Sequence, residues 1–592
     1  MTPSTTTPTP LHVWAPAPAT VSLVVGPPGA DPLTVPMARD EDGWWRPAEA
    51  LPAELESGEV DYGFLLDDAD PPLPDPRSRR QPYGVHGLSR SFDPVAYAWG
   101  DEAWTGRQLA GGVIYEMHVG TFTPEGTLDA AIQRLDHLVE LGVDFVEIMP
   151  VNAFNGTHGW GYDGVLWFAV HEPYGGPAAY QRFVDACHQR GLGVLQDVVY
   201  NHLGPSGNYL PRYGPYLDSG RSNTWGDSVN LDGAESEEVR RLIIDNALMW
   251  LRDYHVDGLR LDAVHALRDS RAIHLLEELA VEVDALSAFL RRPLTLIAES
   301  DLNDPRLITP REAGGYGLAG QWSDDLHHAL YANLTGDTTG YYADFGAPSA
   351  LAKVISAGFL HDGTWSSFRG RRHGRPLDRD TTPAWRLVVC SDNHDQIGNR
   401  ADGHRLASVV GLDQLKLAAL VTLAAPATPM IFMGEEWGAD TPWAFFTSHP
   451  EPELAEAVRR GRREEFAAMN WDLSSVPDPQ DPATFSRSKL DWTEPENGDH
   501  GELLAFVRQL IGLRRTVPDL TLPWFPAATV RCSDADGWLV VERGRTVLAV
   551  NFADADVELE LPAGGPLVEV GSVTATGGRV TLGKHSAVLV GP

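Results

Sequence analysis

Short apolar segments alternate with amphipathic helical patterns along the middle of this 592-residue chain. The apolar segments lie at 113–119, 143–149, 192–199, 258–262, 294–299, 385–390 and 428–433. Strands that are apolar on both faces are typical of a parallel sheet covered by helices. Roughly eight such units predict an α/β chain folded as a (β/α)₈ TIM barrel with inserted loops. The sixth strand is the least distinct, and we place it near 320–323.

Segments with helical periodicity lie between these strands. Leu128, Ile132, Leu135, Leu138 and Val139 are spaced to mark one face of a single helix. Further helices are expected at about 178–189, 239–254 and 270–290, each of which leads into the next strand.

Both ends of the chain have a different pattern. After a Thr/Pro-rich, flexible start at 1–10, short strands separated by Pro, Gly and Asp predict an N-terminal β-sandwich at 11–93. We expect the barrel and its loops to occupy 94–520. A strand, tight turn and strand at 538–552 then predict a C-terminal β-sandwich at 521–592.

The composition excludes several classes of function. With a formal net charge of −36, the chain would repel phosphate, so we expect neither nucleic acid nor an anionic membrane as a partner. No window approaches the roughly 18 apolar residues of a membrane span, and the first residues lack the basic start and apolar run of a signal peptide. Cys187, Cys390 and Cys532 lie far apart and have no metal-ligand spacing. Free thiols in a reducing, cytoplasmic compartment are the simplest interpretation.

Polar clusters follow four of the predicted strands. They are Asp197, Asn201 and His202 after the third strand, Arg260 and Asp262 in the fourth, Glu299 after the fifth, and Asp392, His394 and Asp395 after the seventh. A TIM barrel builds its active site at the carboxyl ends of its strands. Four clusters at corresponding ends, each with a carboxylate, therefore indicate an active site.

The carboxylates suit glycoside hydrolysis, in which one attacks the anomeric carbon and the other protonates the leaving oxygen. Arg260 and Asp262 are two residues apart on a strand and so face the same way; a nearby cation keeps a nucleophilic carboxylate ionised. Glu299 follows an apolar run without an adjacent cation, which suits the proton donor. A purely structural ion pair is the alternative for Arg260 and Asp262.

A second alternative makes the same Asp and His residues metal ligands of a barrel hydrolase. The sequence has no paired-His helix motif and few His residues at the four strand ends. We therefore predict no metal site and no cofactor.

Segments 197–202, 258–262, 297–300 and 393–395 resemble, in order and spacing, the four signature regions of the α-amylase superfamily. The resemblance implies an anomer-retaining double displacement with Asp262 as nucleophile and Glu299 as acid/base. It also implies that Asp395 holds glucose hydroxyls, with Arg260, His202 and His394 in support. Asp197 would mainly anchor the site.

A finer resemblance, over nearly the whole chain, is to the maltooligosyltrehalose trehalohydrolases. It lies in segments 115–126, 158–164, 225–233, 297–306, 321–328, 368–373 and 433–438, and in a carbohydrate-module-like segment at 11–93. It implies hydrolysis of the α-1,4 bond next to the terminal trehalose of maltooligosyltrehalose, which releases trehalose and a maltooligosaccharide. A separate enzyme would then form the substrate.

Two alternatives remain at this point. One is a glycogen branching or debranching enzyme of the same superfamily, which would use the same carboxylates. The other is an inactive glucan-binding protein on the same scaffold; such proteins usually lack a member of the carboxylate set, whereas Asp262, Glu299 and Asp395 are all present. The sequence departs from the family pattern at Gln196, Ser391 and Asp392, which are polar where the family usually has less polar residues. These departures do not affect the three catalytic carboxylates.

Further substrate-binding residues are predicted, each with a structural alternative. Tyr162 is expected to stack on the sugar by analogy with the family, or else to pack in a loop. Trp160 and Trp225 would face the glucan or the trehalose end, or else pack in the core. His265 is expected near the site, and His327 and His328 would line the cleft or cap a helix.

Two other polar segments need an interpretation. Glu435 and Glu436 follow the eighth strand, and we interpret them as supporting structure rather than as catalytic acids. Arg369–Arg372 is expected to form a solvated or product-side loop.

Overall fold

The structure, a computed structural model, describes residues 11–67, 71–223, 226–468, 476–576 and 578–591. Its centre is a closed barrel with the strand order β11-β14-β15-β16-β19-β20-β7-β8. The strands are β7 (Ile114–Met117), β8 (Phe145–Ile148), β11 (Gly193–Val198), β14 (Gly258–Leu261), β15 (Thr295–Ala298), β16 (Gly320–Trp322), β19 (Leu387–Cys390) and β20 (Thr428–Phe432). All eight neighbouring pairs are parallel, which confirms the predicted TIM barrel and the sixth strand.

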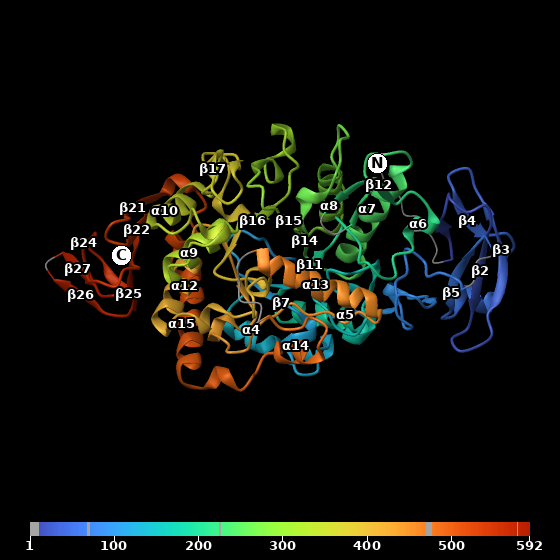
Figure 1. Cartoon of the computed structure of the whole chain (residues 1–592), viewed down its shortest axis with the longest axis horizontal. Coiled ribbons are helices and arrows are strands. Elements are labelled where there is room, and N and C mark those ends of the chain that lie inside the picture. The colour runs from blue at the N-terminus through green and yellow to red at the C-terminus, as the bar shows by residue number, and fades with distance from the viewer. Residues whose placement is uncertain (1–10, 68–70, 224–225, 469–475, 577, 592) are drawn as a thin grey trace.

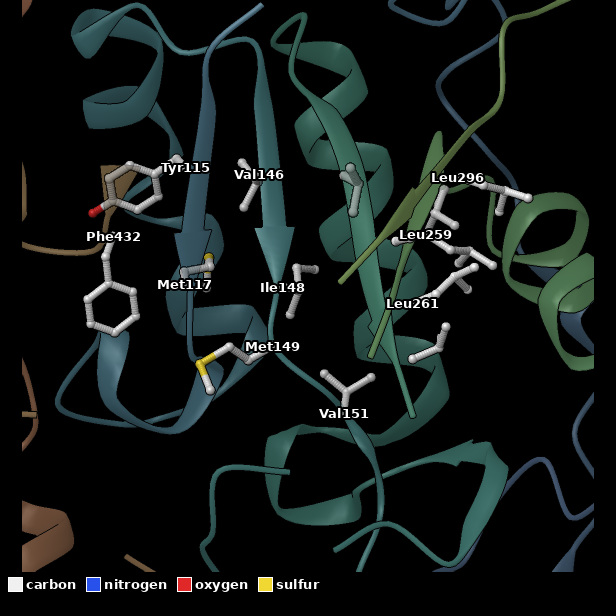
Figure 2. Packing of buried hydrophobic residues seen from close by; sticks show 14 of the residues in the cluster. Tyr115, Met117, Val146, Ile148, Met149, Val151, Leu259, Leu261, Leu296 and Phe432 are labelled. Atoms are coloured by element: carbon white, nitrogen blue, oxygen red, sulfur yellow. The ribbon is translucent and has the colours of Figure 1, made fainter. Parts of the chain in front are cut away.

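The strands are apolar throughout because both of their faces are buried. Tyr115, Met117, Val146, Ile148 and Leu259 point outward toward the helices (Figure 2). Since side chains alternate along a strand, the residues between them point into the barrel. There Ile114, Phe145, Leu195, Ile297, Trp322, Val388 and Met430 form a separate apolar cluster. This cluster fills the lower part of the barrel and supports the site above it.

Helices cover the outside of the barrel. The longer ones are α5 (Gly176–Gln189), α7 (Ser236–Asp253), α8 (Leu275–Leu290), α9 (Asp325–Thr335), α10 (Pro348–Ala357), α12 (Leu412–Ala424), α13 (Pro452–Ala468) and α15 (Gly498–Thr516). Short helices are α1 (Ala53–Ser57), α2 (Val119–Phe122), α3 (Leu128–Ile132), α4 (Leu135–Leu141), α6 (Leu210–Tyr213), α11 (His394–Gly398) and α14 (Pro482–Arg487). Among the described residues, none of these helices is long and apolar enough to cross a membrane.

Three predicted boundaries were inaccurate. The single helix expected from Leu128 to Val139 is two, α3 and α4, interrupted at Gln133 and Arg134, and Val139 is 43% exposed. The helix between β14 and β15, α8, begins at Leu275 rather than near 270. The seventh strand begins at Leu387, because residues 384–386 form a 3₁₀ turn.

Antiparallel sheets lie at the two ends of the molecule, with the barrel between them (Figure 1). The N-terminal sheet has the order β1-β4-β3-β2-β5-β6. Its strands are β1 (Val13–Trp14), β2 (Val21–Gly26), β3 (Leu33–Arg39), β4 (Trp44–Pro47), β5 (Asp61–Leu66) and β6 (Ser89–Arg90). Arg77 and Arg79, in the segment between β5 and β6, pair with Asp245 and Asp253 of α7 at 2.8 Å each, so this segment joins the N-terminal sheet to the barrel.

The C-terminal strands form two sheets, in the orders β21-β22-β23-β28-β25 and β24-β27-β26. They are β21 (Ala528–Ser533), β22 (Trp538–Arg543), β23 (Thr546–Asn551), β24 (Val557–Glu560), β25 (Gly565–Val570), β26 (Val573–Thr576), β27 (Arg579–Leu582) and β28 (Ser586–Gly591). Val540, Ala549 and Val588 of the first sheet share a core with Leu559 and Leu582 of the second. This is the expected face-to-face packing of a sandwich.

Small hairpins occur in the loops above the barrel. They pair β9 (Asn152–Ala153) with β10 (Leu166–Val170), β12 (Leu217–Asn223) with β13 (Gly226–Val229), and β17 (Thr364–Ser366) with β18 (Arg371–His373). The last of these hairpins includes the predicted Arg369–Arg372 loop.

Candidate active site

A layer of ionisable side chains lies directly above the apolar cluster of the barrel interior. On five adjacent strands, the inward positions closest to the carboxyl ends are occupied by Glu116, Glu147, Asp197, Arg260 and Glu299. On four of these strands the charged residue stands two positions after an inward apolar residue, so alternation alone places it above the apolar layer. The barrel thus gathers charges from distant parts of the sequence.

Arg260 is the central cation of this layer. Its side chain is fully buried, and its Nη1 lies 2.6 Å from Oδ1 of Asp262 and 3.0 Å from both carboxylate oxygens of Asp197. Its Nη2 lies 3.8 Å from Oε2 of Glu299. One guanidinium therefore holds Asp262 by a hydrogen bond and lies within ion-pair distance of Glu299 on the neighbouring strand.

Asp262 has a second polar partner. The side-chain amide of Asn201 donates to Oδ2 of Asp262 at 2.7 Å and to its backbone carbonyl at 3.0 Å. The Asp262 side chain remains 12% exposed. Both carboxylate oxygens are thus oriented by fixed donors while the group stays accessible to a ligand.

Glu299 has the environment of a proton donor. Its Oε2 accepts a hydrogen bond from the backbone of Ala263 at 2.5 Å. Burial raises the pKa of Glu299 to about 8, although Arg260 opposes this shift. The sequence shows no cation beside Glu299, but the fold brings Arg260 near it; burial and the negative charges of Asp262 and Asp395 outweigh that cation.

Asp197, Tyr162 and His394 form a buried hydrogen-bonded chain beside Arg260. The Tyr162 hydroxyl donates to Oδ2 of Asp197 at 2.7 Å and lies 2.8 Å from Nε2 of His394. Burial raises the pKa of Asp197 to about 7, with Arg260 acting in the opposite direction. Burial alone would lower the pKa of His394, but Glu116 and Asp395 raise it to about 9. His394 is therefore an imidazolium at neutral pH.

Asp395 is the most exposed of the predicted catalytic carboxylates. It stands in the first turn of α11, and its side chain is 45% exposed. The amide oxygen of Asn393 caps this turn by accepting from the backbone N–H groups of Asp395 and Gln396. Asp395 Oδ1 lies 3.5 Å from Nε2 of His394. The carboxylate is thus held at the rim of the site, open to a ligand.

His202 follows Asn201 and lies near Asp262. Its Nδ1 lies 2.5 Å from the amide oxygen of Asn201 and its Nε2 lies 3.0 Å from the backbone carbonyl of Tyr162. Burial lowers the pKa of His202, which keeps the ring neutral. His202 thus connects the residue that orients Asp262 with the loop that carries Tyr162.

The structure places the remaining predicted residues at varying distances from these groups. Trp160 is buried: its ring stacks on Trp443 at 5.5 Å and its Nε1 donates to the carbonyl of Ala444, which agrees with the packing alternative. His265 follows β14, and its Nδ1 lies 4.0 Å from Oδ1 of Asp301. Trp225 lies outside the described residues.

The two neighbouring histidines of α9 differ. His327 is fully buried; its ring nitrogens contact the carbonyl of Ser391 and, at 2.9 Å, the hydroxyl of Tyr342. It supports the loop before Asn393 rather than facing a ligand. His328 is partly exposed and lines a cleft beside Glu299.

That cleft has an empty volume of about 440 Å³. Ser300 and Asp301, the two residues after Glu299, form one wall. The other walls include Asp324, Asp325, His328, Tyr341, Phe368 and Arg369. Arg369 donates to Oδ2 of Asp301 at 2.8 Å, so the predicted Arg369–Arg372 loop closes one side of the cleft.

A second cavity lies elsewhere, behind β19 and β20 against α12 and α15. Its lining is mostly apolar and includes Glu435 and Glu436 but neither Asp262 nor Glu299. Glu436 accepts from the Tyr115 hydroxyl at 3.0 Å, and Glu435 accepts from the backbone of Phe432. Both therefore support the barrel wall, as expected. Within the described residues, no three His, Cys, Asp or Glu side chains are arranged to hold a metal ion.

Sequence reasoning did not predict the contact of Asn201 with Asp262, and it missed Glu116 as a member of the site. Asn201 stands inside a segment that we singled out, but its amide reaches Asp262 only through the barrel closure between β11 and β14. A signal for Glu116 was present, since it is an ionisable residue within an otherwise apolar predicted strand at 113–119. Glu147 has the same signal in the next strand.

Comparison with known proteins agrees with this architecture. The family model "Alpha amylase, catalytic domain" matches residues 92–219, and "Domain of unknown function (DUF3459)" matches residues 523–589. A crystal structure of a Salmonella typhimurium protein assigned to the alpha amylases superposes with a TM-score of 0.87 at 36% identity, covering 98% of this chain and 97% of that one.

Two curated relatives are similar over almost their full length. The chain is 62% identical over 582 residues to the malto-oligosyltrehalose trehalohydrolase of Arthrobacter ramosus, with 98% of each chain covered. It is 59% identical over 587 residues to the protein of that name from Rhizobium sp. (strain M-11), covering 98% of this chain and 97% of that one. The chain belongs to the malto-oligosyltrehalose trehalohydrolase family within the α-amylase superfamily.

Proposed function

We propose that the chain is a retaining glycoside hydrolase that cleaves the α-1,4-glucosidic bond next to the terminal trehalose of maltooligosyltrehalose. The products are trehalose and a shortened maltooligosaccharide, so the reaction serves trehalose biosynthesis. The observation that carries this proposal is that Arg260 contacts both Asp262 and Glu299 beside a cleft that begins at Ser300. The names of the full-length relatives support the same substrate.

In the first step Asp262 attacks the anomeric carbon and forms a glycosyl ester. Arg260 and Asn201 hold its two oxygens in place for the attack. Glu299 donates its proton to the departing glycosidic oxygen, and its pKa of about 8 keeps that proton on the carboxyl group at neutral pH.

In the second step Glu299, now a carboxylate, takes a proton from water as the water oxygen attacks the anomeric carbon, and the bond from that carbon to the Asp262 carboxylate breaks. Two inversions retain the anomeric configuration. The exposed carboxylate of Asp395 accepts hydrogen bonds from sugar hydroxyls in the reacting subsite, and Tyr162 packs against the same sugar. The reaction consumes only water besides the sugar.

The leaving group must lie on the side of the proton donor. The 440 Å³ cleft fulfils this condition because its wall continues directly from Glu299 into Ser300 and Asp301. Carboxylates, His328 and Arg369 line it and can accept from or donate to the hydroxyls of a neutral disaccharide. We therefore place the trehalose unit in this cleft.

The proposal includes a cytoplasmic location and a separate enzyme that forms the trehalose end of the substrate. All three cysteines lie in the described part of the chain and are free, which suits a reducing compartment. The net charge of −36 argues against nucleic acid as a partner.

Product analysis tests the function. The purified chain is incubated in parallel with maltooligosyltrehalose and with a linear maltooligosaccharide of equal length, and released sugars are separated by chromatography. We expect rapid release of trehalose from the first and little cleavage of the second. Equal cleavage of both would indicate a general amylase. Action only on branched glucan would instead support the branching or debranching alternative, and no action on any substrate would support an inactive binding protein.

A further inference from the structure

Glu116 lies beneath the catalytic carboxylates and contacts His394 at two points. Its side chain points into the barrel from β7 and is 1% exposed. Its Oε1 contacts Nδ1 of His394, and its Oε2 accepts from the backbone N–H of the same residue at 3.2 Å. A carboxylate from the first barrel strand thus fixes the turn that begins α11 after the seventh strand.

The contact continues as an unbroken chain toward the nucleophile. Because both ring nitrogens of an imidazolium carry protons, His394 donates through Nδ1 to Glu116 and through Nε2 to the Tyr162 hydroxyl. Tyr162 then has its own proton free to donate to Asp197, as the 2.7 Å distance indicates. Asp197 in turn holds Arg260, which holds Asp262.

The direction of each hydrogen bond depends on the charge of His394. A neutral ring has one proton, so it cannot donate at both nitrogens. If Nε2 were bare, the Tyr162 hydroxyl would turn to it and Asp197 would lose that donor. The charge of His394 therefore decides which donors Asp197 has.

Several groups besides Glu116 face His394. They are His118, Glu147, Tyr162, Asp197, Arg260 and Asp395. Arg260 disfavours a second cation, and burial keeps His118 neutral by lowering its pKa to about 3. Burial also raises the pKa of Glu147 well above its usual range, which disfavours a negative charge at that position. Glu116 contacts Nδ1 of the His394 ring, whereas Asp395, which is 45% exposed, lies 3.5 Å from Nε2.

We propose that Glu116 is a positioning residue of the reaction: it holds His394 as an imidazolium and thereby keeps the Tyr162, Asp197 and Arg260 chain oriented toward Asp262. The effect on turnover rests on the proposed function, whereas the effect on His394 does not.

Glu116→Gln tests the proposal because it keeps the shape of the side chain and removes the charge. Loss of a carboxylate in direct contact lowers a histidine pKa by roughly 2, so the pKa of His394 should fall from about 9 to roughly 7. At pH 8 the protonated fraction would then fall from about 90% to about 10%, and at pH 5.5 it would hardly change.

The variant's kcat/KM for maltooligosyltrehalose, divided by that of the wild type, should therefore be about tenfold lower at pH 8 than at pH 5.5. Taking this ratio cancels the titrations that both proteins share, namely that of Glu299 and that of Asp197, whose pKa of about 7 also lies in this range. The matched control is Glu147→Gln, at the facing position of the neighbouring strand, because neither oxygen of this buried carboxyl has a hydrogen-bond partner among the described residues. Its ratio should be the same at both pH values.

Titration of the ring nitrogens of His394 by NMR, in the absence of substrate, provides the second measurement. The wild type should show both nitrogens protonated at pH 7 and Glu116→Gln should titrate near 7; Glu116→Asp, which retains the charge, should titrate nearer the wild type. An equal loss of activity at both pH values, or a wild-type His394 that is neutral at pH 7, would overturn the proposal. If the chain did not act on maltooligosyltrehalose but His394 titrated as expected, the proposed function would fail while the assignment of Glu116 would stand.

Discussion

The role of Glu299 gives the most quantitative prediction. An ordinary glutamate with a pKa of 4.5 would be protonated in about 0.3% of molecules at pH 7, whereas a pKa of about 8 gives about 90%. The burial of Glu299 therefore supplies roughly a 300-fold higher population of the proton donor. Glu299→Gln removes the transferable proton, and loss of a general acid typically lowers the rate about 10²–10⁴-fold.

The loss should depend on the leaving group. On maltooligosyltrehalose, where the departing oxygen needs a proton, kcat/KM should fall by at least about a hundredfold. On an aryl maltooligoside with an acidic phenol as leaving group, the fall should be less than about tenfold, since the phenolate leaves without protonation. Steady-state kinetics with both substrates from pH 5 to 9 measure these losses.

The same experiment contains the pH test. The wild type should lose activity on maltooligosyltrehalose as the pH rises through about 8, because Glu299 then gives up its proton. Glu299→Gln should lack this decline. Equal losses on the two substrates, or an unchanged alkaline decline in the variant, would refute Glu299 as the proton donor.

Four further predictions concern the same residues. Asp262→Asn should lower kcat more than a thousandfold with the fold intact, because an amide cannot form the glycosyl ester; a folded variant within tenfold of the wild type would exclude Asp262 as nucleophile. Arg260→Gln should reduce the free energy of unfolding by about 3–5 kcal/mol, measured with denaturant, because it leaves Asp197 buried without its cation; a loss below about 1 kcal/mol would contradict this. Tyr162→Phe removes the hydroxyl that Asp197 and His394 share, so unfolding should become about 1–3 kcal/mol easier, and an unchanged stability would argue against the buried chain. Glu299→Gln should be more stable than the wild type, by a larger margin at pH 8 than at pH 5. The pKa of Glu299 in the folded state lies above the ordinary value, so the wild type loses stability as the pH rises from about 4.5 to 8, whereas Gln does not titrate. A stability difference in thermal melts that is the same at both pH values would contradict the raised pKa.

The barrel was predictable because its buried strands and the helices around them each leave a pattern in the sequence. A strand buried on both faces must be apolar along its whole length, so segments such as 192–199 and 428–433 identified strands without any long-range information. Alternation then predicted that Arg260 and Asp262 face the same way, and their 2.6 Å contact confirms it. The helix at 128–139 was less predictable, since periodicity alone does not reveal an interruption at Gln133.

Contacts between strands were not predictable from the sequence. The approach of Arg260 to Glu299 depends on the register of β14 against β15, and the contact of Glu116 with His394 depends on barrel closure near β7. The same limitation applies to His327, whose position two residues after Asp325 gave no indication that its ring would be fully buried. Propensity and spacing describe one element at a time, whereas these distances belong to pairs of elements.

The most direct test of the account is to trap the covalent intermediate. Glu299→Gln is mixed with an α-maltooligosyl fluoride, whose leaving group needs little protonation, and the protein is digested and analysed by mass spectrometry. Without the general base the ester should accumulate, and the glycosyl group should be found on the peptide that contains Asp262, at Asp262 itself. A label on Asp197 or Asp395, or release of the inverted anomer without any labelled protein, would contradict the account.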